Sequence, residues 1–315
     1  MNLEIWPGDW GLPSIDSNCL EVLTYLKMCG AEAELTAANN PLRSPSGHFP
    51  VLRHEEAVIG SLDDIILHLK RQNYNPDYAL SARQCADSLA FSNLLRDRLE
   101  PALWLCWWVD AKNSTELTRK WYASHLRFPL NFYYPSVWEE AARRRLAAVC
   151  DFDATPEAVE AYVCRRADEC FSSLSEQLGD RHWFLGGSAP TSLDARVFGL
   201  LAPLLRAPLP SHRLQGLLKG YPNLVTFVGR VQQKFFVKER DEYEARQKDR
   251  RSGEGGGSRA DNSADDAEFP HKRRNQVLAG LVAAVVMLTF ALTNGIVKIE
   301  TQDQSEYDMS EMDAD

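Results

Sequence analysis

The chain has 315 residues, of which 44% are hydrophobic and 25% are charged, and its formal net charge is −9. This composition is typical of one large or two small globular domains with a substantial core. A net acidic chain lacks the basic face of nucleic-acid-binding proteins, so we expect no nucleic acid among its partners. Its first residues, MNLEIWPGDWGLP, have neither the features of a signal peptide nor those of a transit peptide.

The first part of the chain alternates short apolar runs with helical patterns. Helices are expected at 17–30, ending at Gly30, and at 61–72, starting with a capping-box-like Ser61-x-x-Asp64. Strands are expected at 3–6, 33–37, 49–54 and 57–60. The resulting β-α-β-β-β-α order predicts an α/β thioredoxin-like domain over 1–75, with Pro50 at the position of that fold's cis-proline.

From Leu80 onward the pattern is purely helical, which predicts an all-α domain over 76–240. Two helices are expected to begin with capping boxes, Ser81-x-x-Gln84 and Thr191-x-x-Asp194, and the first of them should end near Pro101. Apolar residues recur at helical spacing in several further stripes, namely Cys85, Leu89, Leu95 and Leu99; Val159, Val163, Ala167, Cys170, Leu174 and Leu178; Val197, Phe198, Leu201 and Leu205; and Leu224, Val228, Val231 and Phe235.

The C-terminal end of the chain has a different composition. Residues 241–274 are rich in charge, Gly and Ser and are expected to form a flexible tether. The 21 residues from Val277 to Val297 carry no charge, and as a helix they would rise about 31 Å, which matches the hydrocarbon core of a bilayer. We therefore expect one transmembrane anchor over 275–298, followed by an acidic tail over 299–315.

The charges beside this anchor predict its orientation. The preceding side is basic and the following side is acidic, which keeps the N-terminal part in the cytosol. So few residues follow the span that insertion into the lipid bilayer is expected after translation, as in a tail-anchored protein. The flanking cations are Lys272, Arg273 and Arg274, and the lipid-facing residues are expected to include Val277, Leu281, Val285, Leu288, Leu292 and Val297.

The cysteines and histidines do not form a metal-binding or disulfide pattern. Seven cysteines lack metal-ligand spacing, so we expect reduced thiols facing the cytosol, with Cys85 and Cys170 on or beside apolar helical stripes. The histidines show no i, i+4 pair, and His48, His54 and His68 have no obvious partner. No metal and no cofactor are therefore expected. The run of three arginines at 143–145 is interpreted as a solvated helix face.

Aromatic residues are concentrated between Trp104 and Trp138. More than half of these rings are expected in the core, but so many rings beside Arg also indicate an interaction surface. The candidate partner face consists of Trp121, Tyr122, Phe128, Phe132 and Tyr133.

An α/β domain followed by a helical domain resembles the glutathione-transferase architecture. Several stretches, including WGLPSID, SPSGHFPVLR, YNPDYALSARQCADSLAF, RKWYASHLRFPLNFYYP and RRNQVLAGL, further resemble the metaxin family over most of the chain, and the anchor resembles that of its membrane-anchored member. This resemblance implies the mitochondrial outer membrane, the sorting and assembly machinery with its β-barrel assembly channel, and a second, unanchored metaxin as partner. It also implies associations with cristae-bridging complexes and transport adaptors. From the residues alone, the endoplasmic reticulum and the peroxisome stay open as locations.

The resemblance also indicates where a glutathione site would lie. Ser14, Ser17 and Cys19 at the start of the first helix are thiol-activating candidates by residue type only. The interpretation we favour is an N-cap, either a serine or Asp16, and a core-facing Cys19. Ser61 and Pro50 are interpreted as vestigial glutathione-site positions.

Two departures from the transferase pattern weaken such a site. Gly60 replaces the acidic residue that transferases carry before this serine, and the segment after 33–37 is too short for the second transferase helix. We therefore expect a non-catalytic import receptor or scaffold with no catalytic residue. The alternatives are a tail-anchored glutathione-dependent transferase and an adaptor for mitochondrial transport.

Overall fold

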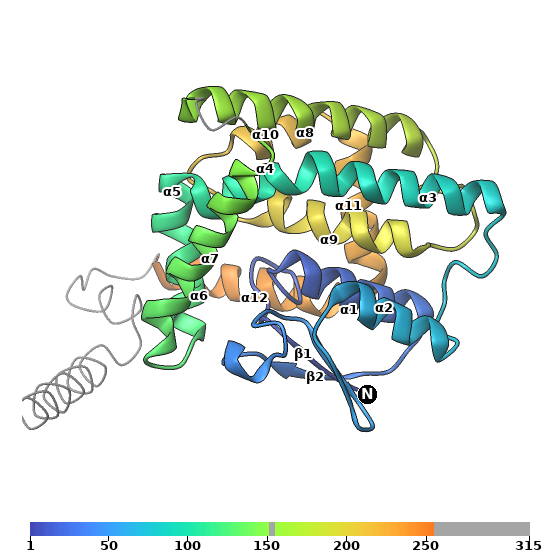
Figure 1. Cartoon of the computed structure of the whole chain (residues 1–315), viewed down its shortest axis with the longest axis horizontal. Helices are drawn as coiled ribbons and strands as arrows, with labels where there is room; N and C mark the ends of the chain where they lie inside the picture. The colour runs from blue at the N-terminus through green and yellow to red at the C-terminus, as the bar shows by residue number, and fades with distance from the viewer. Residues whose placement is uncertain (151–154, 255–315) are drawn as a thin grey trace, which may run out of the picture. The chain divides into compact units, whose positions relative to one another are not determined.

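The computed structural model describes residues 1–150 and 155–254, which belong to one compact unit of the chain (Figure 1). Its four-stranded sheet has the order β2-β1-β3-β4. The strands are β1 (Asn2–Ile5), β2 (Glu34–Ala37), β3 (Val51–His54) and β4 (Ala57–Ile59). The β1–β2 pair is parallel, and the other two pairs are antiparallel. The predicted β-α-β-β-β-α order is confirmed, whereas the boundary at residue 75 stays a prediction.

Two helices belong to the sheet part of the unit. Helix α1 (Ser17–Cys29) begins at the N-cap Asp16 and ends at Gly30, whose φ of 68° is the left-handed conformation that glycine adopts at low cost. Helix α2 (Leu62–Arg71) begins at Ser61, but the Ser61 side chain makes no cap hydrogen bond, so the predicted capping box is wrong. Two carboxylates, Asp63 and Asp64, stand instead beside the positive end of this helix.

The rest of the unit is helical. It comprises α3 (Ala82–Leu94), α4 (Glu100–Trp104), α5 (Ala111–Asn113), α6 (Arg119–His125), α7 (Leu130–Ala147), α8 (Pro156–Leu178), α9 (Ser192–Arg206), α10 (Arg213–Lys219), α11 (Pro222–Phe235) and α12 (Val237–Glu254). Short π-helical segments connect the successive helices from α3 to α6; they are Leu95–Leu99, Leu105–Val109 and Ser114–Thr118. The predicted end near Pro101 is wrong, because this proline lies in the first turn of α4, where a missing N–H removes no helical bond.

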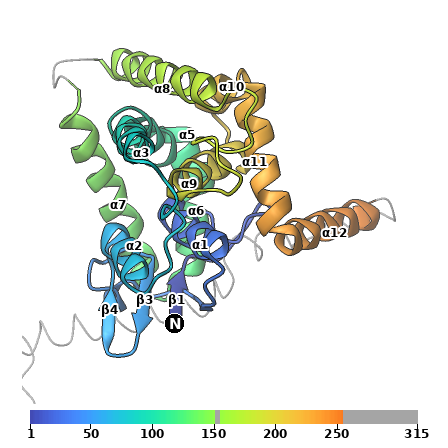
Figure 2. The same cartoon turned by 90° about the vertical axis from the view of Figure 1, so that its right-hand side faces the viewer.

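Helix α9 lies at the centre of the helical part. Figure 2 shows α8 and α3 above it, with α7 on one side and α11 on the other. Both predicted capping boxes, Ser81–Gln84 and Thr191–Asp194, are confirmed. Helix α9 also packs closely on α1, because Gly199 has no side chain: a Cβ at Gly199 would lie 2.9 Å from the Ser17 carbonyl oxygen.

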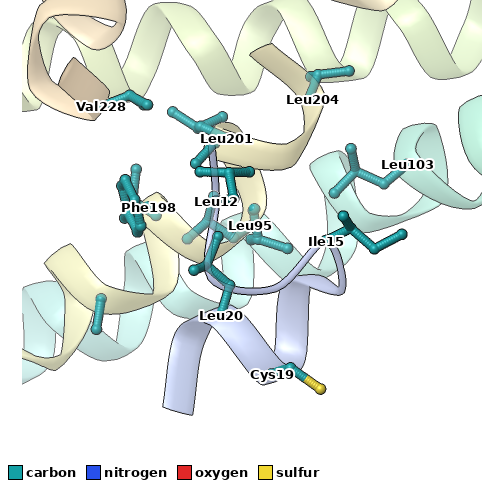
Figure 3. Packing of buried hydrophobic residues seen from close by; sticks show 14 of the residues in the cluster. Leu12, Ile15, Cys19, Leu20, Leu95, Leu103, Phe198, Leu201, Leu204 and Val228 are labelled. Carbon is teal, nitrogen blue, oxygen red and sulfur yellow. The ribbon is translucent and has the colours of Figure 1, made fainter. Parts of the chain in front are cut away.

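The core joins the start of the chain to α9. Figure 3 shows Leu12, Ile15 and Leu20 close to the α9 side chains, and Phe198, Leu201 and Leu204 are all fully buried there. One cluster of buried apolar residues runs from the sheet through α1 and α9 to α11. Hydrophobic burial is the main favourable term in folding, so this cluster fixes the sheet part against the helices.

Two of the predicted apolar stripes have different outcomes. Cys170 and its neighbours on α8 are buried, as predicted. Cys85 and Leu89 on α3 are exposed, Leu89 at 64%, so their predicted core-facing stripe is wrong. The physical reason is that α3 packs through its other face, where Phe91 and Leu94 are partly buried against the core. All seven cysteines are free thiols.

The start of the predicted tether is also helical. Residues 241–254 belong to α12, so the expectation of a flexible segment from 241 is wrong for this part. Ion pairs at i, i+4 spacing support the helix, including Glu242 with Arg246, and Tyr243 packs against the core. None of the helices within 1–150 and 155–254 combines the length and the apolar character that crossing a membrane requires. The predicted anchor at 275–298 and tail at 299–315 lie outside the described residues.

Candidate functional site

The start of α1 is closed by an acidic cap. The Asp16 carboxylate accepts a hydrogen bond from the Cys19 N–H at 2.9 Å, and burial raises the pKa of Asp16. Ser14 and Cys19 are fully buried, and burial, followed by the neighbouring Asp16, raises the pKa of the Cys19 thiol well above its usual value. A thiol in such surroundings stays protonated and unreactive. The interpretation of Asp16 as a cap and of Cys19 as a core residue is confirmed.

A cavity of about 210 Å³ adjoins this helix start. It lies between α1, the 48–49 segment, α4 with the turn after it, and α7. Its wall is mostly aromatic, and its polar groups come from both parts of the unit. The residues that line it include Trp6, Asp16, Ser17, Asn18, His48, Phe49, Glu100, Trp104, Trp107, Trp108, Tyr122, Trp138, Ala141, Ala142 and Arg145.

The charged groups around the cavity largely compensate one another. Glu100 pairs with Arg196 at 3.0 Å, although burial raises the pKa of Glu100. Burial, and then the nearby Arg145, lowers the pKa of His48, which favours its neutral form. Arg145 itself lies over the Trp104 ring, 5.6 Å from the ring centroid.

The arginine run at 143–145 therefore divides between two environments. Arg143 and Arg144 form exposed ion pairs with Glu139 and Glu140, as expected for a solvated face. Arg145 is also exposed, as expected, and in addition lines the cavity.

Of the two vestigial glutathione-site positions, Pro50 follows the cavity residue Phe49, whereas Ser61 lines a separate hollow with Ser46 and Gly60. The Phe49–Pro50 peptide bond is cis, as predicted from the position of Pro50. Between β2 and β3 the chain forms only a short 3-10 turn, Pro41–Arg43, followed by a loop in which the Ser44 hydroxyl hydrogen-bonds to the His48 carbonyl oxygen. The predicted lack of a full second helix is confirmed.

The five residues of the predicted partner face differ in their exposure to solvent. Trp121 and Tyr122 are each only 8% exposed, so their assignment to a docking face is wrong. Tyr122 packs edge-to-face on Trp6 with 5.0 Å between ring centroids, and the Trp121 indole N–H donates to Asp9 at 3.1 Å. Through these contacts α6 packs against the segment that follows β1, so both rings are core residues.

The other part of that face is exposed on α7. Phe132 is 68% exposed and Tyr133 is 65% exposed, and Phe128 is partly buried with its ring centroid 6.1 Å from that of Phe132. Phe132 and Tyr133 line a shallow groove with Val137, beside Glu140 and Arg144. We call this surface, made of Phe132, Tyr133 and Val137, the α7 patch.

The histidines include one pair. His54 Nδ1 lies 3.0 Å from His68 Nε2, so the expectation that these two residues lack a partner is wrong. Strand β3 and helix α2 bring them together, which their sequence spacing does not indicate. No group of three or more His, Cys, Asp or Glu residues suited to a metal ion occurs within 1–150 and 155–254.

Comparisons with known proteins match nearly the whole chain. The chain is 41% identical over 303 residues to Metaxin-1 of Mus musculus, covering 95% of this chain and 92% of that protein. The chain belongs to the metaxin family. A second metaxin, Metaxin-3 of Xenopus laevis, is 39% identical over 239 residues, covering 75% of this chain and 77% of the relative.

Two family profiles also match parts of the chain, and one solved structure shares its fold. Residues 19–139 match the Tom37 family, described as an outer mitochondrial membrane transport complex protein, and residues 167–231 match the C-terminal domain of glutathione S-transferases. The beta-etherase LigF from Sphingobium has a TM-score of 0.50 at 15% identity, covering 78% of this chain and 98% of that chain, which shows the fold alone. The predicted glutathione-transferase-like fold of this metaxin is confirmed.

Sequence reasoning missed the polar groups of the cavity. Glu100, His48 and Arg145 lie far apart in the chain, and their sequence positions do not indicate that they meet. One signal was present, because Trp104, Trp107 and Trp108 have the i, i+3, i+4 spacing that places them on one helix face. In this metaxin, three tryptophans on one helix face are a pattern that indicates the aromatic wall of a pocket.

Proposed function

We propose that this metaxin is a non-catalytic subunit of the outer mitochondrial membrane machinery that imports proteins and assembles β-barrels. The similarity to Metaxin-1 over 95% of the chain and the Tom37 match support this role. The folded part acts as a cytosol-facing receptor or scaffold. The cap at Asp16 is the single structural observation that carries the non-catalytic assignment.

The argument against catalysis is electrostatic. A glutathione transferase must stabilise a thiolate, and a helix N-terminus can help through its free N–H groups. In this chain the Asp16 carboxylate already occupies that end and accepts from Cys19. A second anion placed beside this carboxylate is disfavoured by like-charge repulsion. Glutathione would therefore keep its thiol protonated at this site.

The membrane part of the proposal rests on the sequence. The uncharged segment from Val277 to Val297 is long enough to span a bilayer, and the basic residues Lys272–Arg274 precede it. We assign the anchor, the cytosolic orientation of the folded part and an acidic tail in the intermembrane space on this basis.

The partners that fit this role are a second, unanchored metaxin and the β-barrel assembly channel. The α7 patch is the surface that we assign to a protein partner.

Thiol-transfer activity tests the non-catalytic assignment directly. The full chain in mild detergent is assayed with glutathione and a chromogenic electrophile, beside an active transferase as positive control. We expect no turnover above the uncatalysed rate and no retention on immobilised glutathione. Turnover that disappears in a Ser17→Ala variant would identify a thiol-activating hydroxyl and would overturn the assignment.

A further inference from the structure

The rings that line the cavity differ from ordinary core rings. Trp104, Trp107 and Trp108 are only partly buried, whereas Tyr122 and Trp138, whose ring centroids lie 5.3 and 5.8 Å from that of Trp108, are buried. Trp107 stacks on Trp10 at 6.1 Å between ring centroids, which fixes one side of this wall. Preorganised rings around an open space favour an aromatic guest, because a ring pair adds about 0.5–1.5 kcal/mol beyond its buried area.

The size of the cavity limits what it can hold. Its volume of about 210 Å³ is well below the roughly 300–1,000 Å³ typical of pockets for drug-sized ligands. A whole tripeptide such as glutathione exceeds this space, whereas a single large side chain matches it. The cavity is therefore suited to one anchor group of a larger molecule.

The charged residues at the cavity wall favour a neutral ligand group in the cavity. At the cavity wall Asp16 and Arg145 are of opposite charge, and Glu100 is already paired with Arg196. An isolated cation or anion would find no net opposite charge to offset its desolvation. A neutral ring whose polar tip can reach these groups suffers no such penalty.

The cavity edge is open to an extended chain. His48 and Asn18 are exposed there, and the loop that carries His48 follows the short 3-10 turn Pro41–Arg43. Polar side chains at the rim of an aromatic pocket are suited to hydrogen-bond the backbone that carries an anchor residue.

We propose that the cavity binds one aromatic side chain of an extended polypeptide segment, with the ring against the tryptophans that line the cavity and the peptide backbone along His48 and Asn18. The inference rests on the proposed import function, because unfolded client segments are the class of polypeptide that would supply such a side chain.

Photo-cross-linking with a defined peptide tests this assignment. The probe is a fluorescein-labelled octapeptide of alternating Thr and Ser with one central p-benzoylphenylalanine, and matched peptides carry Leu or Lys at that position. The full chain in mild detergent should bind the aromatic peptide saturably, and both matched peptides at least about tenfold more weakly. Cross-links should map to 100–108 or 138–145. Cross-links confined to the α7 patch, or no saturable binding, would overturn the proposal.

A cavity-filling variant supplies the matched comparison. Ala142 lines the cavity on α7 and is buried, so Ala142→Leu should occupy the space of the guest ring. Ala147→Leu on the same helix is the control, because Ala147 does not line the cavity. We expect about tenfold weaker peptide binding for the first variant and none of this loss for the second. Unchanged peptide binding by a folded Ala142→Leu protein would contradict the proposal.

The cavity assignment and the proposed function can be contradicted independently of each other. A native extraction in which wild-type chain recovers its assembly partners, combined with absent peptide binding, would overturn the cavity assignment alone. Failure of the wild-type chain to recover these partners in the extraction would overturn the proposed function, whether or not the cavity binds the peptide.

Discussion

Asp77 holds the N-terminus of α9 through both of its carboxylate oxygens. Oδ1 accepts from the Ser192 backbone N–H at 2.8 Å, and Oδ2 accepts from the Ser192 hydroxyl at 2.7 Å. Lys70 on α2 also donates to Asp77 at 2.9 Å. One carboxylate in the connection between α2 and α3 therefore links the sheet part of the fold to its central helix.

Removing this carboxylate should destabilise the fold. We expect Asp77→Ala to lower the free energy of unfolding by about 1–3 kcal/mol, because the partly buried N–H of Ser192 would lose its acceptor. Chemical denaturation followed by tryptophan fluorescence measures the change. Asp77→Asn, which keeps one acceptor oxygen, should lose less. Equal losses for both variants would show that acceptor geometry is not what matters at this position.

Gly199 allows the close approach of α1 and α9. A Cβ there would lie 2.9 Å from the Ser17 carbonyl oxygen and 3.0 Å from Glu21, so Gly199→Ala should destabilise the protein by about 1–3 kcal/mol. Gly229 on α11 is the control, because a Cβ there meets nothing within 4 Å. Gly229→Ala should stabilise by roughly 0.5–1 kcal/mol through helix propensity. Thermal melting of both variants checks the opposite signs, and two losses of similar size would contradict the packing argument.

Glu21 should make stability depend on pH. It is buried, and burial raises its pKa to about 7, with Glu100 and Asp63 adding to the rise and Arg196 opposing it. The folded state then binds a proton more tightly than the unfolded state, so stability is fully present below about pH 4.5 and falls as pH rises to about 7. The loss amounts to about 3 kcal/mol.

Substituting this residue isolates its contribution to the pH dependence. Glu21→Gln stays neutral, so its stability relative to wild type should rise between pH 4.5 and 7 and stay constant above that range. Urea denaturation at four pH values measures this difference. A difference that does not change with pH would show that Glu21 ionises normally in the folded chain.

The α7 patch should separate binding from folding. Phe132→Ala combined with Tyr133→Ala removes two exposed rings, so the melting temperature should stay within a few degrees of wild type, while partner recovery should fall at least about tenfold. Trp121→Ala is the contrast, because this ring is buried and its loss should cost about 3–5 kcal/mol. Collapse of the double variant on heating would show that the patch belongs to the core.

Local patterns predicted the elements but not the site. The Thr191-x-x-Asp194 cap was evident from spacing alone, because a capping box is a contact between residues three apart. The burial of Tyr122 and the exposure of Tyr133 could not be told apart, since both lie in the same aromatic run. Their difference depends on the segment after β1, where Trp6 packs against only the first of them.

The cavity depended even more on tertiary structure. Asp16, Glu100 and Arg145 come from three segments that the fold brings together. No spacing along the chain indicates their proximity. Helix α12 was missed for another reason: its charged sequence resembles a tether, and the contact of Tyr243 with the core is not visible from composition.

Native recovery of this chain from mitochondria tests the central claim most directly. Gentle detergent extraction, pull-down on the full chain and mass spectrometry should recover a second metaxin and the β-barrel assembly channel in the outer-membrane fraction. Recovery of the chain alone, or on another membrane, would contradict its assignment as a subunit of the import and assembly machinery.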